Sequence, residues 1–176
     1  MNHIIGAKRV TGLAALLALG LAGCSTFGTN KDSFTCPATT TVPDLQTIAR
    51  LANSGKDEDI QTASRIALVS STCDKESAGV ATYVSIEFAA LRAGPGIRHV
   101  EFPYFVAIAD STGNILGKQE FTLGLDFPGE AATMRTTEKV TAHLPLKNPQ
   151  LGNIYTVIVG FQLNKNELDF NRTHQK

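Results

Sequence analysis

The sequence has no tryptophan, and its 16 lysine and arginine residues are balanced by 16 aspartate and glutamate residues. It also lacks a basic cluster and any strand pattern in which basic and aromatic residues alternate. Proteins that bind nucleic acid through its phosphate backbone carry such a basic surface. The composition therefore gives no reason to expect nucleic acid as a partner.

The chain also lacks an apolar run long enough for a permanent transmembrane helix. The apolar stretch from Val10 to Ala22 is shorter than the ~20 helical residues that cross a hydrocarbon core. Lys8 and Arg9 precede it, as in the charged first part of a secretory leader. Residues 1–23 are therefore predicted to be an export signal.

Cysteine is scarce, and the first of the three cysteines stands where the leader ends. The sequence Leu21-Ala22-Gly23-Cys24 resembles the lipobox of bacterial lipoproteins. The resemblance implies that the Cys24 thiol receives a diacylglycerol, that the leader is cut before Cys24 and that the new amino group is acylated. An ordinary leader with a chance cysteine is the alternative. Two or three acyl chains hold a protein stably on a membrane, and Ser25 in place of an aspartate favours the outer membrane.

The other two cysteines, Cys36 and Cys73, are predicted to form a disulfide, because an exported chain meets oxidants. A metal pair and a reactive thiol are the competing readings. Neither has support, since no second Cys or His stands at zinc-ligand spacing around either residue. Removal of the leader takes two basic residues and no acid, which leaves a net charge near −2.

Strand signals dominate the rest of the chain. Apolar and polar residues alternate with a period of two in 80–90 and 134–144, as expected for strands with one buried face. Two β-rich runs, 102–109 and 115–125, flank a turn cluster at 110–114 and predict a hairpin. Further strands are predicted at 60–73 and at 153–163, the second apolar on both faces. The segment 44–55 also fits a helical stripe, but we favour a first strand.

About seven strands separated by turns predict an all-β fold, an antiparallel immunoglobulin-like β-sandwich, with a barrel as the alternative. Residues 24–35 comprise the lipidated cysteine and a small, polar tether without a period. The sandwich is predicted to span 36–176 and to end in a short helix or turn.

The mature chain resembles a family of uncharacterised lipoproteins from alphaproteobacteria. The likeness rests on four blocks of sequence: Cys36-Pro37, Thr72-Cys73, 102–121 with the preceding glutamate, and 159–172. No activity is attached to this family, so the resemblance implies no catalytic residue.

Residues suited to catalysis are thinly spread. The sequence contains no catalytic signature such as G-x-S-x-G or H-E-x-x-H, and we interpret His99, His143 and His174 as surface histidines. Asp110 and Asn114 with Glu120 supply too few carboxylates for a calcium loop. We therefore predict neither an enzyme nor a bound metal or cofactor.

The C-terminal block crowds charged and apolar side chains together at Glu167, Leu168, Phe170 and Arg172. One interpretation is a docking surface for a partner. In the other, which we favour, Leu168 and Phe170 close the open end of the sandwich while Arg172 pairs with a carboxylate.

The sequence thus predicts a lipoprotein of the bacterial envelope, anchored in the outer membrane and facing the periplasm, with surface exposure left open. We expect a structural or protein-binding module without enzymatic activity, and another envelope protein as its partner. A carrier of a small apolar ligand or lipid between the two sheets is the alternative, motivated by the nine phenylalanines.

Overall fold

The computed structural model describes residues 34–52, 60–94 and 96–174. The chain divides into two units, 1–31 and 32–176, and all described residues belong to the second. The predicted leader, Cys24 and the tether up to residue 33 lie outside the described residues. No helix within the described ranges is long and apolar enough to span a bilayer.

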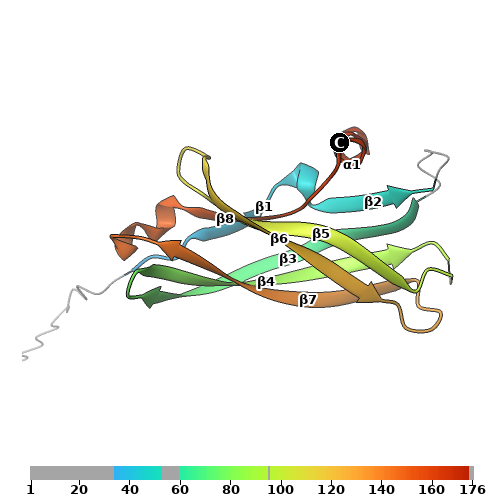
Figure 1. Ribbon diagram of the computed structural model, residues 1–176, viewed down its shortest axis with the longest axis horizontal. Coiled ribbons are helices and arrows are strands. Elements are labelled where there is room, and N and C mark those ends of the chain that lie inside the picture. The colour runs from blue at the N-terminus through green and yellow to red at the C-terminus, as the bar shows by residue number, and fades with distance from the viewer. Residues whose placement is uncertain (1–33, 53–59, 95, 175–176) are drawn as a thin grey trace, which may run out of the picture. The chain divides into compact units, whose positions relative to one another are not determined.

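Two four-stranded sheets face each other, which confirms the β-sandwich (Figure 1). The first sheet has the order β1-β8-β5-β6 and the second the order β2-β3-β4-β7. Among the described strands every neighbouring pair is antiparallel except β1 and β8, which run parallel. The strands are β1 (Ala38–Thr41), β2 (Thr47–Leu51), β3 (Ile60–Glu76), β4 (Gly79–Arg92), β5 (His99–Ala109), β6 (Ile115–Asp126), β7 (Thr133–Pro145) and β8 (Thr156–Phe161).

The described chain has eight strands rather than about seven, because the sequence analysis missed β1. Its residues, Ala38 to Thr41, show no alternation of apolar and polar side chains. The strand is held instead by its backbone pairing with β8 and by a 2.7 Å hydrogen bond between the hydroxyls of Thr39 and Ser71. A strand made in this way leaves no signal in a hydrophobic pattern.

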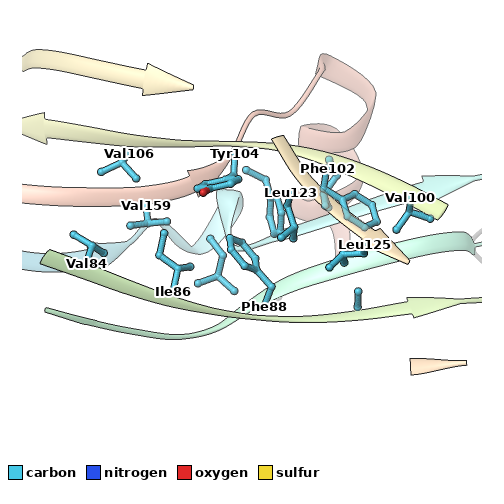
Figure 2. Packing of buried hydrophobic residues seen from close by; sticks show 14 of the residues in the cluster. Val84, Ile86, Phe88, Val100, Phe102, Tyr104, Val106, Leu123, Leu125 and Val159 are labelled. Carbon is cyan, nitrogen blue, oxygen red and sulfur yellow. The ribbon is translucent and has the colours of Figure 1, made fainter. Parts of the chain in front are cut away.

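The core follows from the alternation along β4 and β5. Val84, Ile86 and Phe88 point inward from β4 toward side chains of the facing sheet such as Val159 and Tyr104 (Figure 2). Aromatic rings fill the centre: the ring centroids of Phe88 and Tyr104 lie 5.2 Å apart, and those of Phe88 and Phe161 lie 5.7 Å apart. Burial, followed by the charge of Glu138, raises the pKa of Tyr104 to about 12, so this phenol stays neutral.

The predicted hairpin is confirmed as β5 and β6, joined by residues 110–114. The Asp110 carboxylate organises the turn by accepting hydrogen bonds from the backbone N–H groups of Thr112 and Asn114 and from both side chains. These bonds, with the Thr112 side chain first among them, lower the pKa of Asp110 to about 2. The carboxylate is therefore a turn element, as Asp often is at this place.

The predicted disulfide between Cys36 and Cys73 is confirmed, with their Cα atoms 5.8 Å apart. Cys36 lies just before β1, a strand of the first sheet, whereas Cys73 lies in β3, a strand of the second sheet. The disulfide therefore ties the chain just before β1 to the second sheet.

Two further segments show where propensity and structure differ. The ambiguous segment 44–55 begins with a 3-10 turn, η1 (Pro43–Leu45), and continues as strand β2, so the favoured strand is confirmed as far as the chain is described. In contrast, the strand predicted from residue 153 begins at Thr156, because a 3-10 helix, η3 (Pro149–Ile154), occupies the start of that segment. The Asn148 side chain caps η3 by accepting the Gln150 N–H.

Candidate binding surfaces

The predicted terminal helix is present as α1 (Lys165–His174). It begins with a capping box, in which the Asn164 side chain accepts the Glu167 N–H at 3.0 Å and the Glu167 carboxylate accepts the Asn164 N–H at 2.8 Å. Arg172 donates to the Asp44 carboxylate at 3.0 Å, the kind of pairing that the sequence analysis expected. Glu167 and Arg172 therefore both have structural partners.

Asn171, which the sequence analysis did not single out, holds α1 against the sandwich. Its side chain is 2% exposed and donates to the carbonyl oxygens of Asp44 at 2.8 Å and Thr47 at 2.7 Å. An asparagine inside a helix is unfavourable unless its amide finds such partners. The sequence signal that could have identified Asn171 was a polar residue within the predicted helix, one turn after Leu168.

Leu168 and Phe170 are half-buried, and neither belongs to the core cluster or to the partly buried hydrophobics packed against it. The interpretation that these two side chains close the core is therefore wrong. The Phe170 ring instead stacks on His174, with 4.3 Å between the centroids, and lines an open groove of about 810 Å³ between α1 and β2. Arg50, Glu167 and Asp169 give this groove a charged rim.

A second surface lies along β6, the last strand of the first sheet (Figure 1). The side of β6 that faces away from β5 has no strand neighbour within the described part of the chain. All residues from 115 to 120 are exposed, including Ile115 at 54% and Leu116 at 56%. An exposed edge of this kind is a template for pairing with another strand.

A slot opens beside this edge, between β6 and the edge strand β7 of the other sheet, with a volume of about 300 Å³. Val106, Ile108, Val140 and Ala142 contribute its apolar lining, and Lys118, Gln119, Thr141 and His143 its polar lining. Gly117 stands opposite Ile108 in the register, and a Cβ built on Gly117 would meet nothing within 4 Å. The slot therefore exists because β6 lacks a side chain at an inward-facing position.

The outer face of β6 carries a lysine, Lys118. The Lys118 ammonium lies 4.7 Å from the centre of the Phe105 ring and donates to the Glu120 carboxylate at 2.9 Å and to the Gln162 side chain. Charged side chains on edge strands discourage unspecific pairing. Lys118 is one of the residues that line the slot, but its ammonium is held by Phe105, Glu120 and Gln162.

Of the three histidines named above, His143 lines the slot beside β6 and His174 lines the α1 groove, whereas His99 lines neither. His99 pairs with Asp126 at 2.7 Å and with Glu101 at 3.5 Å, and these hydrogen bonds raise its pKa, Asp126 more than Glu101. His143 pairs with Glu76 at 3.1 Å, and His174 stacks on Phe170. Within the described ranges, no three His, Cys, Asp or Glu residues gather in a way that could hold a metal ion.

No protein-family model matches the chain, and no curated protein matches it in sequence. Among solved structures it is similar to the crystal structure of a DUF1425 family member from Shewanella sp. pv-4. The two share 14% sequence identity, and the match covers 66% of this chain and 98% of the other, with a TM-score of 0.28. A TM-score this low supports no inference about function from that structure. The function proposed below rests on the residues of this chain.

Proposed function

We propose that this protein is a lipoprotein of the bacterial outer membrane, held by acyl chains on Cys24 and facing the periplasm, that binds another envelope protein without catalysing a reaction. We further propose that the partner adds an extended segment to the edge of β6. The observation that carries this proposal is that the slot beside Gly117 lies next to an exposed strand edge.

Strand addition uses two features that meet on β6. Main-chain hydrogen bonds to the edge supply affinity, and pockets that receive every second side chain supply specificity. The slot lies on the inner side of the edge, between Ile108 of β5 and Val140 of β7. A partner segment with an apolar side chain at the position next to Gly117 would place that side chain in the slot.

A carrier of an apolar ligand is less well supported. Such a ligand would lie between the sheets, where Phe88, Phe102, Tyr104 and Phe161 already pack ring against ring at centroid distances of 5.2–6.3 Å. The slot opens at the edge of the sandwich rather than at its centre. Its position suits a side chain from an added strand.

The anchor is tested by replacing Cys24 with serine and separating membranes from soluble fractions after a salt wash. A serine cannot carry the thioether-linked diacylglycerol, so we expect the Cys24→Ser protein to leave the membrane pellet. Recovery of the variant in the washed pellet, at the level of the unmodified protein, would show that another part of the chain holds it there.

The edge is tested by a Gly117→Val substitution, which fills the slot with a side chain that favours strands. We expect valine to preserve or raise thermal stability, because glycine inside a strand costs roughly 0.5–1 kcal/mol relative to alanine. At the same time the slot can no longer receive a partner side chain. Co-purification of the partner from gently solubilised membranes should therefore fall at least tenfold.

The matched control is Gly124→Val, on the outer face of the same strand, where the new Cβ would lie 3.7 Å from the His99 ring. This variant should retain the partner.

The Phe170→Ala variant, in the α1 groove, shows which of the two candidate surfaces binds the partner. If Phe170→Ala loses the partner while Gly117→Val keeps it, the binding surface is the α1 groove and the strand-addition proposal is refuted.

A further inference from the structure

We infer that the end of the sandwich bearing η3 faces the bilayer and that Leu151 and Ile154 insert between the lipid headgroups. This inference rests on the proposed lipid anchor at Cys24. It concerns a surface different from β6 and from the α1 groove, and it commits to a lipid surface as the occupant.

The helix η3 is fastened to the point where the described chain begins. The Thr35 hydroxyl donates to the Gln150 carbonyl at 2.7 Å and accepts the Asn153 N–H at 3.0 Å. Gly152 packs against the same residue so closely that a Cβ there would lie 1.7 Å from the Thr35 carbonyl oxygen. Any constraint on the position of Thr35 therefore also constrains the position of η3.

The length of chain between the proposed anchor and this contact is short. Only residues 25–33 separate Cys24 from the described chain. Even a fully extended chain from Cys24 to Phe34 spans at most about 35 Å, at about 3.5 Å per residue. An anchor at Cys24 would therefore hold the residues next to η3 within this distance of the bilayer, at a high effective concentration with respect to the lipid surface.

The exposed chemistry of η3 suits a membrane interface. Leu151 is 46% exposed and Ile154 is 42% exposed. They are three residues apart in a 3-10 helix, which has three residues per turn, so their side chains project from the same face. Short amphipathic elements of this kind bind bilayers through the apolar area that they bury between headgroups.

The surroundings of η3 keep the cost of approach low. Residues 148–164 and 34–43 contain no charged side chain, and charges are the groups whose removal from water costs most. The charged residues that directly flank these two stretches in the sequence are Lys147 and Lys165 around the first and Asp32 and Asp44 around the second. Two positive and two negative charges cancel, so insertion should occur on zwitterionic as well as anionic bilayers.

The absence of tryptophan from the sequence permits a test without background signal. Leu151→Trp and Ile154→Trp would each be introduced into the mature acylated protein, which is then reconstituted into phosphatidylcholine vesicles with and without 30% phosphatidylglycerol. Tryptophan fluorescence would be measured with lipids brominated on the upper acyl carbons and with iodide in the water. The matched control is Leu68→Trp, at a 59% exposed leucine on the outer face of β3.

We expect the emission of Leu151→Trp and Ile154→Trp to shift by at least 5 nm to the blue on reconstitution, and brominated lipid to quench more than a third of it. Leu68→Trp should keep its emission wavelength and remain open to iodide. Flotation of the same vesicles reports separately on the anchor. If the protein floats but both η3 variants behave like Leu68→Trp, the anchor stands and this inference is refuted; if the protein does not float, both fall.

Discussion

Replacing Arg92 with methionine should lower the free energy of unfolding by about 3 to 5 kcal/mol, the largest effect we expect from a single substitution outside the aromatic core. Arg92 is only 3% exposed, and its guanidinium donates to three carbonyl oxygens: Ala131 at 2.8 Å, Ile97 at 2.7 Å and Gly129 at 2.6 Å. Its charge also lies 5.2 Å from the centre of the Phe127 ring. Methionine fills a similar volume but leaves all three carbonyls without this donor.

The size of the effect follows from the position of Arg92 at the end of β4. Its three partners lie in the loops that connect β4 to β5 and β6 to β7, so one side chain ties two crossings between the sheets. Each hydrogen bond to a charged group contributes roughly 1.5 to 3 kcal/mol, and the contributions overlap because the fork is a single unit. Lysine should not rescue the loss, since it lacks the planar fork that reaches three acceptors at once.

Urea denaturation of the Arg92→Met, Arg92→Lys and unmodified proteins measures this loss directly. Arg135→Met is the control, because Arg135 is exposed and pairs with Glu87, itself on the surface of the neighbouring strand. An exposed pair contributes roughly 0.2 to 1 kcal/mol. If Arg92→Met cost no more than Arg135→Met, the guanidinium would not be what holds the two loops.

Much of the sandwich could be predicted from the sequence because burial on one face imposes a period of two. Alternation along β4 predicted which side chains of that strand meet the core, and the turn cluster from Asp110 to Asn114 predicted the β5–β6 hairpin. The disulfide was predictable for a different reason, since only Cys36 and Cys73 remain once Cys24 is assigned to the proposed lipid anchor. The strand and turn signals each lie within one short segment of the sequence, and the disulfide involves a choice among very few cysteines.

The rest depends on contacts between segments far apart in the chain. Arg92 and Asn171 both donate to main-chain carbonyls, whose positions no side-chain pattern reveals. The slot beside Gly117 depends on which strand lies at the edge of each sheet, and periodicity does not give strand order. Phe170 shows the reverse error, because an apolar side chain next to charged ones was assigned to the core and instead lines a groove.

Removing the Cys36–Cys73 disulfide should destabilise the sandwich by about 4 kcal/mol, the chain-entropy value for a loop of this length. The sequence separation of 37 residues means that the bond closes a long loop in the unfolded chain. In the folded state it fixes the chain just before β1, a strand of only four residues that sits at the edge of its sheet. Without the bond, β1 is held by its pairing with β8, by the Thr39–Ser71 contact and by the hydrogen bonds of Thr35 to η3.

A Cys36→Ala/Cys73→Ala double variant tests this without leaving a free thiol. Its melting temperature should fall by roughly 8 °C or more, since 1 kcal/mol moves a domain of this size by ~2 to 4 °C. Reduction of the unmodified protein should produce the same fall, and reductant should leave the double variant unchanged. A shift of less than about 2 °C would mean that the contacts of β1 hold the N-terminal end unaided. Because η3 is fastened to Thr35, next to Cys36, the proposed insertion of η3 into lipid predicts that the double variant also weakens lipid quenching of Leu151→Trp.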